Sequence, residues 1–345
     1  MNMKKLKFFS KLVFIANSLA AFLLLISYLL PYVPPKSFAT LSVLSLGVPL
    51  LISINIVFFV YWLLQVKKQM LLSLVVLLLG WNYLGSLYKF SSSKKVEEPN
   101  NLSVMSFNVR LFNKYNWKPN KTTKEDIIDF IHKESPDVLC IQEYSRGKPI
   151  KLNGYDDFNG RFVKNVKGGH AIFSKLPIIN SGSLEFEDTN NNAVFADVVK
   201  GKDTIRVYNV HLQSAKINTE IDYINSQYSR DVFIKRVKWA FQKQQSQVEK
   251  FLKHKSKCPY KTIVAGDFNN TAFSYSYKKI LGDDLVDTFE KAGNGFGKSF
   301  DIKFFPLRID FILADKRFKV NGFKTYSDIN LSDHYPIKAT LNLNK

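Results

Sequence analysis

The chain has 345 residues, which is enough for one large domain and an additional segment. Lys and Arg total 49 against 29 Asp and Glu, a formal net charge of +20 that favours anionic partners such as phosphates, nucleic acid or acidic lipid headgroups. Two cysteines, Cys140 and Cys258, exclude a disulfide framework and a cysteine-based metal site.

Three apolar runs without a charged residue occupy the N-terminal part of the chain: Leu12–Leu30, Leu41–Leu64 and Met70–Leu87. Each is about as long as a helix that crosses a bilayer, so we predict a membrane region of three transmembrane helices at residues 1–88. A cleaved signal peptide is the alternative for the first run, and a buried helical bundle is the alternative for the whole region. Two further runs argue against the first, and the lack of amphipathicity argues against the second.

The basic residues next to these runs predict the orientation. Lys67 and Lys68 follow the second run, the loop between the first two runs carries only Lys36, and four lysines precede the first run, namely Lys4, Lys5, Lys7 and Lys11. The positive-inside rule then places the N-terminus in the cytoplasm. We therefore predict a multi-pass protein of the cell membrane with everything after the third run on the non-cytoplasmic side.

A polar, Ser-rich stretch at residues 89–100 is typical of a linker, and an α/β domain is predicted at 101–345. In this domain β-branched runs alternate with helical patterns, which indicates two packed sheets covered by helices. The helices are expected at 124–134 and 231–254. The strands are expected at 102–109, 138–143, 171–174, 194–199, 204–211, 263–265, 309–314 and 339–343.

Polar residues gather where these predicted strands end. One such residue is usually a cap or a turn residue, but so many of metal-ligand or acid–base type indicate a site held by a rigid scaffold. Gly266, before one of them, is expected to let the backbone turn. The set consists of Asn108, Glu143, His211, Asp267 with Asn269, Asp310, and Asp333 with His334.

Six short segments make the pattern specific. They resemble, in this order, the endonuclease/exonuclease/phosphatase superfamily, which includes deoxyribonuclease I, exonuclease III, sphingomyelinases and inositol polyphosphate 5-phosphatases. The resemblance covers about residues 101–345 and implies a four-layer α/β sandwich with Mg²⁺-dependent phosphoester hydrolysis. The segments are Ser106–Arg110, Ile141–Glu143, Asn209–Leu212, Gly266–Asn269, Arg308–Ile312 and Leu331–Pro336.

The resemblance implies a metal site and a substrate site. Glu143 is a hard oxygen donor that suits Mg²⁺, or Mn²⁺ as the alternative cation, with Asn108 and Asp333 as further ligands. Arg110 could touch phosphate, although a solvated surface Arg is an equal alternative. His170 is a weaker candidate for lining the cleft, because Gly168-Gly169-His170 precedes a predicted strand.

The catalytic roles follow from the same resemblance. Asp267 would orient or deprotonate the attacking water, and Asn269 would hold that water and a phosphate oxygen. His334 would act on the phosphate or as an acid–base group, with Asp310 fixing its tautomer. His211 favours a two-histidine site in which one imidazole protonates the leaving oxygen, as in the deoxyribonuclease I-like and sphingomyelinase-like members.

These predictions describe a membrane-anchored, Mg²⁺-dependent phosphodiesterase, most simply a nuclease. The substrate would be a nucleic acid or a phospholipid headgroup, the lipid bilayer is the other partner, and no protein partner is inferred. Residues 299–307 lack the Arg-rich, Cys-containing segment of inositol phosphatases, which disfavours that substrate class. The alternatives are a lipid-directed phosphodiesterase, a phosphomonoesterase, and a non-catalytic binding module on the same fold.

Overall fold

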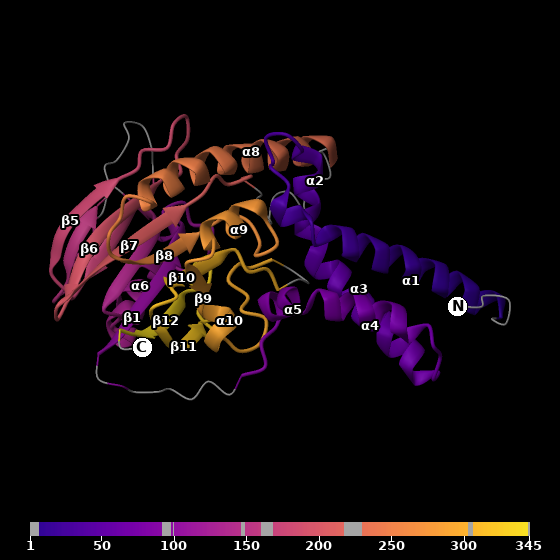
Figure 1. The fold of residues 1–345 in the computed structure, drawn as a ribbon. Helices are drawn as coiled ribbons and strands as arrows, with labels where there is room; N and C mark the ends of the chain where they lie inside the picture. The colour runs from indigo at the N-terminus through magenta and orange to yellow at the C-terminus, as the bar shows by residue number, and fades with distance from the viewer. Residues whose placement is uncertain are drawn as a thin grey trace.

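Two six-stranded sheets lie face to face in the computed structural model, and a bundle of apolar helices projects from one end of them (Figure 1). The structure describes residues 7–91, 98, 100–145, 149–159, 168–216, 230–302 and 306–343. Part of the predicted linker, residues 92–97 and 99, lies outside the described residues.

The first sheet has the order β11-β12-β1-β2-β4-β3, in which β1 and β2 are parallel and the other neighbours are antiparallel. Its strands are β1 (Asn101–Asn108), β2 (Val138–Ser145), β3 (Asp156–Asn159), β4 (Gly168–Ser174), β11 (Lys319–Thr325) and β12 (Ile337–Asn342). The second sheet has the order β5-β6-β7-β8-β10-β9, with β7 and β8 as its parallel pair. Its strands are β5 (Ile178–Ser183), β6 (Ala193–Lys200), β7 (Asp203–His211), β8 (Lys261–Asp267), β9 (Leu285–Asp287) and β10 (Asp310–Asp315).

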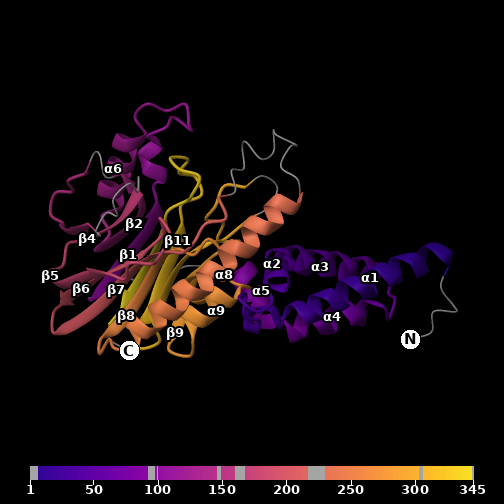
Figure 2. The ribbon, with the colours of Figure 1, turned by 90° about the horizontal axis from the view of Figure 1, so that it is seen from above.

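Apolar side chains from both sheets form the core between them, for example Val104 and Ile172 against Val207 and Ile263. One helix layer covers each outer face (Figure 2). Helix α6 (Thr123–Glu134) packs on β1 and β2, while α8 (Arg230–Lys255) packs on β7 and β8. The predicted four-layer α/β sandwich is therefore confirmed.

The predicted strands are present with small shifts at their ends, but several elements were not predicted. The missed strands are β3, β5, β9 and β11, and the missed helices are α9 (Tyr275–Leu281) and α10 (Thr288–Ala292). Each missed strand is first or last in the chain of hydrogen-bonded neighbours in its sheet, and β3 and β5 are largely solvent-accessible. Such strands lack the apolar alternation that indicates a half-buried strand.

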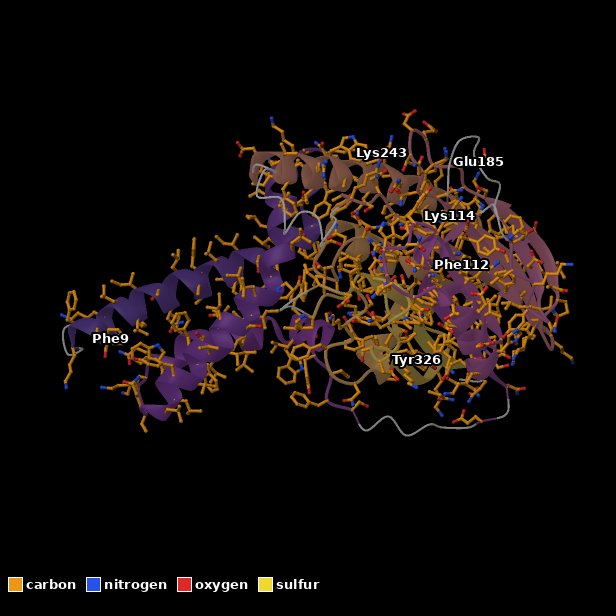
Figure 3. All side chains as sticks on the ribbon, turned by 180° about the vertical axis from the view of Figure 1, so that it is seen from behind. Phe9, Phe112, Lys114, Glu185, Lys243 and Tyr326 are labelled. Carbon is orange, nitrogen blue, oxygen red and sulfur yellow. The ribbon has the colours of Figure 1, made fainter. Side chains whose placement is uncertain are left out.

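The N-terminal helices form an antiparallel bundle whose apolar side chains, such as Phe9, project outward (Figure 3). Two helical segments, Phe8–Tyr32 and Ala39–Leu64, are long and apolar enough to cross a membrane. The third predicted span is broken into two helices that meet at 79°, so the region has three spans only if this bent pair counts as one. The helices are α1 (Phe8–Ser27), η2 (Leu30–Tyr32), α2 (Ala39–Val43), η3 (Leu44–Gly47), α3 (Val48–Leu64), α4 (Met70–Leu79) and α5 (Trp81–Leu87).

Gly80 stands at the break between α4 and α5. A Cβ atom there would lie 2.0 Å from the hydroxyl oxygen of Tyr28, which donates a hydrogen bond to the Val76 carbonyl at 3.0 Å. The absence of a side chain thus lets α1 approach α4 where the chain turns. An apolar run read from sequence carries no signal for this bend, because the bend depends on a neighbouring helix.

The bundle is docked on the sandwich at two places. Lys36, between the first two spans, donates its backbone N–H to Gln245 of α8 at 2.8 Å and its ammonium group to Glu249 at 2.5 Å. At the second place, Arg308 donates to the carbonyl of Ser86 at the end of α5 at 3.1 Å. The loop between the first two spans and the α/β domain therefore lie on the same side of the bundle.

Candidate active site

Strand register brings three of the predicted site residues side by side. His211 at the end of β7 is paired with Asp267 at the end of the parallel strand β8. Asp310 at the start of the antiparallel strand β10 is paired with the same Asp267. Asn108 approaches from the facing sheet, because it ends β1 and its side-chain amide lies 3.1 Å from the Asp267 carboxylate.

One oxygen, Oδ2 of Asp267, is the point on which the site converges. Nδ2 of Asn108 and Nδ2 of Asn269 lie 3.1 and 3.2 Å from it, and Nε2 of His211 and Nε2 of His334 lie 3.5 and 3.7 Å from it. The other oxygen accepts the backbone N–H of Asn269 at 2.7 Å. Burial raises the pKa of Asp267 to about 7, with His334 opposing the shift and Asp310 adding to it.

The sequence suggested that the chain turns at Gly266 after its strand. In the structure Gly266 lies inside β8. Its φ is 146°, and a Cβ atom there would lie 1.9 Å from the carbonyl oxygen of Val210 in β7. Only glycine fits both the conformation and this close approach. Gly266 therefore allows the last residue of β8, Asp267, to stay in register with His211.

His334 and Asp310 form the predicted pair, with Nδ1 of the imidazole 2.9 Å from a carboxylate oxygen of Asp310. Ser299 supports the pair by accepting the backbone N–H of Asp310 at 3.0 Å. Burial disfavours the charged imidazole, but Asp310 and Asp267 together raise the pKa of His334 to about 10. His334 is thus an imidazolium held between two carboxylates.

The second histidine, His211, lies in a different electrostatic environment. Burial, helped by the nearby His170 and His334, holds the pKa of His211 well below its usual value. The rings of His211 and His170 are 5.6 Å apart, and burial lowers the pKa of His170 to about 4. The sequence predicted that His170 precedes a strand, but it lies within β4. The structure places its ring next to that of His211.

The sequence placed Glu143 at the end of its strand, but the structure places it inside β2. The ladder between β2 and β4 shifts register between Gln142 and Tyr144, and Glu143 has a φ of 52°. A β-bulge of this kind re-aims one side chain, which here brings Glu143 to 3.4 Å from the amide nitrogen of Asn108. Burial, and then the neighbouring Asp333, raises the pKa of Glu143.

Arg110 and Asp333 complete the rim of the site. The Arg110 guanidinium lies 3.2 Å from the Asp333 carboxylate and stacks over the ring of Trp117 at 4.5 Å. Its backbone N–H donates to the amide oxygen of Asn108 at 3.1 Å. In this arrangement Asn108 uses its oxygen for the backbone and points its nitrogen at Glu143 and Asp267, so it offers donors to the carboxylates.

One group in the described part of the chain has the geometry to hold a metal ion. Ligand atoms of Asp267, Asp310 and His334 all lie within 4.8 Å of one another. Within that group, Nδ1 of His334 is engaged by Asp310 and the neighbouring acids favour the protonated ring, which has no lone pair to offer a metal, whereas Glu143 and Asp333 form a second pair of neighbouring acidic groups. The ligand chemistry therefore favours the Glu143 side for a cation.

Sequence reasoning missed one residue that supports the site from behind. Gln244 of α8 is fully buried, and its amide nitrogen lies 2.9 Å from the carbonyl of Gln213, 3.3 Å from that of Phe268 and 3.2 Å from that of Asn269. Its amide oxygen accepts from Asn270 at 2.8 Å. A glutamine in a polar, basic helix gives no sequence signal for this role, apart from its place on the apolar face of α8.

Comparisons with known proteins identify the family and the fold. The sequence model of the Endonuclease/Exonuclease/phosphatase family matches residues 105–334, and that of a domain of unknown function, DUF8431, matches residues 10–87. No curated protein matches the chain. The match to the Endonuclease/Exonuclease/phosphatase family covers most of the chain and includes all the site residues named above.

Solved structures share the fold at low sequence identity. D. rerio TDP2 complexed with a single-strand DNA product is 17% identical, with a TM-score of 0.55 over 71% of this chain and 100% of that one. The Bacteroides vulgatus endonuclease/exonuclease/phosphatase is 20% identical, with a TM-score of 0.55 and coverage of 71% and 100%. The human Nocturnin catalytic domain with bound sulfate is 17% identical, with a TM-score of 0.52 and coverage of 70% and 93%. With its family match, fold and site, the chain belongs to the endonuclease/exonuclease/phosphatase family and is a metal-dependent phosphoester hydrolase.

Proposed function

We propose that this protein is a membrane-anchored, Mg²⁺-dependent phosphodiesterase whose catalytic domain lies on the non-cytoplasmic side. The observation that carries the proposal is the convergence of two amides and two imidazoles, within 3.1–3.7 Å, on one buried oxygen of Asp267. A single buried carboxylate with this many partners suits the activation of one water molecule.

Glu143 and Asp333 are the residues that would hold Mg²⁺, with Asn108 orienting the Glu143 carboxylate. The donor set fits, since Mg²⁺ prefers carboxylate oxygens and Asp333 is close enough to Glu143 to raise the pKa of the Glu143 carboxyl. When bound, Mg²⁺ would neutralise charge on the phosphoryl oxygens.

The chain's own groups would divide the remaining work. Asp267 would accept the proton of the attacking water, and Asn269 would hold that water in line. The imidazolium of His334 would offer its Nε2–H to a phosphoryl oxygen, where negative charge develops. His211, neutral in the free enzyme, would gain proton affinity as the anionic phosphodiester enters, would take up a proton from solvent, and would then donate it to the leaving oxygen.

Nucleic acid is the substrate that we propose first. A neighbouring structure, D. rerio TDP2, carries a single-strand DNA product, and this chain has a net charge of +20. Arg110 stacked on Trp117 places a cation and an aromatic face at the rim, which suits a phosphate next to a base. The docked membrane bundle favours a phospholipid headgroup as the second candidate.

The topology can be tested by fusing reporters after Asn100. The lysine distribution predicts that alkaline phosphatase is active at this point and that a cytoplasmic reporter is inactive. The opposite result would place the site in the cytoplasm and would reject the proposed sidedness.

The catalytic proposal can be tested with Glu143→Gln in the full chain. Hydrolysis of bis-p-nitrophenyl phosphate, p-nitrophenyl phosphate, DNA and sphingomyelin would be compared with and without Mg²⁺. We expect a large loss that excess Mg²⁺ only partly restores, together with weaker Mg²⁺ binding by calorimetry. The matched control is Glu125→Gln, an exposed charge on α6. Full activity in a folded Glu143→Gln protein would remove Glu143 from the metal site.

A further inference from the structure

An aromatic cluster joins the end of the membrane bundle to a loop of the catalytic domain. The ring of Tyr88 lies 4.6 Å from that of Phe90 and 4.7 Å from that of Phe296. Between them, Lys89 exchanges two backbone hydrogen bonds with Gly295, each 2.9 Å long. We call Tyr88, Phe90 and Phe296 the aromatic foot.

The loop is shaped to display its aromatic side chain. Gly295 and Gly297 on either side of Phe296 have φ values of 70° and 60°, and a Cβ atom on Gly297 would lie 2.4 Å from the ring of Phe289. The backbone thus turns tightly on both sides. Phe296 is left 45% exposed and Phe90 88% exposed, and because both rings contact the ring of Tyr88 they form one contiguous apolar patch.

The position of the foot along the bundle can be read from its neighbours. A small cavity of about 10 Å³ is lined by Phe296 together with Ser86 and Leu87 of α5 and Pro49 of α3. Pro49 is in the first turn of α3, whose 17 residues span about 26 Å, close to the hydrocarbon thickness of a bilayer. The earlier part of the span Ala39–Leu64, α2 and η3, packs on α8, so Phe296 lies at the level where the span leaves the α/β domain.

Helix α5 lies at the same boundary. It turns by 79° from α4, so it runs across the bundle and not along it, and its first residue, Trp81, is 67% exposed. Exposed aromatic side chains at the end of apolar helices are typical of the lipid–water interface. An aromatic ring is more stable at this interface than in bulk water or in the hydrocarbon core.

We propose that the aromatic foot lies in the lipid–water interface of the membrane that holds α1 and α3, so that the catalytic domain itself contacts lipid. The proposal rests on the membrane anchoring proposed above. It commits to lipid as the occupant because the exposed rings continue the apolar surface of the spans at the same level. Contact at Phe296 would fix the tilt of the domain against the bilayer, in addition to the docking of Lys36 and Arg308.

Spin labels on the full chain in phosphatidylcholine–phosphatidylglycerol vesicles would test this. Single cysteines would be placed by Phe90→Cys and Phe296→Cys in a Cys258→Ser background, because Cys140 is fully buried. Collision with oxygen, which concentrates in lipid, would be compared with collision with a water-soluble nickel chelate. Two controls give the reference values for lipid and for water. Val57→Cys, exposed on the middle of α3, reports lipid, and Tyr115→Cys, exposed near the rim of the active site, reports water.

We expect the ratio of oxygen to nickel collisions at Phe90 and Phe296 to lie between those of the two controls and well above that of Tyr115. A ratio equal to that of Tyr115, with Val57 in lipid, would overturn the aromatic foot and leave the membrane anchor intact. Low collision rates with both reagents would also overturn it, because protein, such as a second copy of the chain, would then cover the site. A water-like ratio at Val57 would reject the anchor and with it the foot. Phosphodiesterase activity is a separate measurement and does not enter these outcomes.

Discussion

The N-terminal helical bundle and the α/β domain each bury a polar network, and the two networks are built in opposite ways. In the bundle, Asn17 donates to Ser73 at 2.6 Å and accepts from Trp62 at 3.0 Å, while Asn55 accepts from Ser73 and donates to the carbonyls of Ala20 and Leu51. Every group is neutral and each amide uses both its ends. This network links α1, α3 and α4 and leaves nothing for a ligand.

The catalytic network is charged and incomplete. Carboxylates and imidazoles crowd around Asp267, and among the described residues Nε2 of His170 and Nε2 of His211 have no hydrogen-bond partner. Unpartnered atoms also occur at Gln142, Gln247, Arg308 and Asn321, so such an atom alone does not mark a site, but two of them on neighbouring imidazoles in a charged cluster do. The difference teaches that closure of a polar network indicates a structural role, whereas charge with unused hydrogen-bonding capacity indicates a site.

The largest effect is expected from Asp267→Asn, which removes the charge at the centre of the second network. We expect kcat to fall by about a thousandfold or more, because the water loses its proton acceptor. Burial raises the pKa of Asp267, so its ionised form is disfavoured in the folded state, and the neutral variant should have an unchanged or higher Tm. A variant with retained kcat would show that another group activates the water.

A loss of about a hundredfold is expected from Asp310→Asn, in keeping with a general acid–base role for its partner. The amide removes the negative charge beside the ring, so the pKa of His334 should fall from about 10 toward the ordinary value. Proton NMR titration of the imidazole would measure this. His254, which bonds Tyr208 away from the site, should titrate as before; an unchanged pKa of His334 would reject the pairing in solution.

A smaller effect, about tenfold on kcat, is expected from Gln244→Met, which keeps the shape of the side chain and removes its hydrogen bonds. Gln244 acts through the loop that carries Asn269, so the substitution should have little further effect in an Asn269→Ala background. Gln245→Met, which loses a contact with Lys36 instead, is the matched control and should keep full kcat. Independent, additive losses would make Gln244 a merely structural residue.

The smallest effect on activity is expected in the first network. Asn17→Leu leaves the indole N–H of Trp62 without its acceptor and removes the donor to Ser73, whose hydroxyl still donates to Asn55, at a cost of about 1 kcal/mol in bundle stability. Thermal unfolding in detergent should show a lower midpoint, while kcat remains unchanged. Asn82→Ala, on an exposed position of α5, is the control. A drop in kcat would mean that the two networks are coupled.

The sequence predicted which residues belong to the candidate site better than it predicted how these residues are arranged. Residue type and strand position indicated Asp267, His211 and Asp310 as polar residues at strand ends, which register places together, whereas the pairing of His334 with Asp310 came from the resemblance to the family. The bulge that aims Glu143 and the strained Gly266 were not predictable, since both depend on contacts with a neighbouring strand.

The supporting residues and the bend of the last span were missed for a related reason. Gln244 and Ser299 act through backbone groups that are distant in sequence, and their residue types are common in loops and helices. Likewise, the turn at Gly80 arises where Tyr28 packs against it. Long-range contacts leave no periodic pattern in a sequence.

The two docking contacts also change what the linker means for the enzyme's reach. A free tether of roughly ten extended residues would let a domain wander about 35 Å from its anchor and sample a wide volume. Here Lys36 and Arg308 hold the domain directly on the bundle, so the orientation of the active site relative to the bundle is fixed by these contacts. The length of the linker then does not set the volume that the active site can reach.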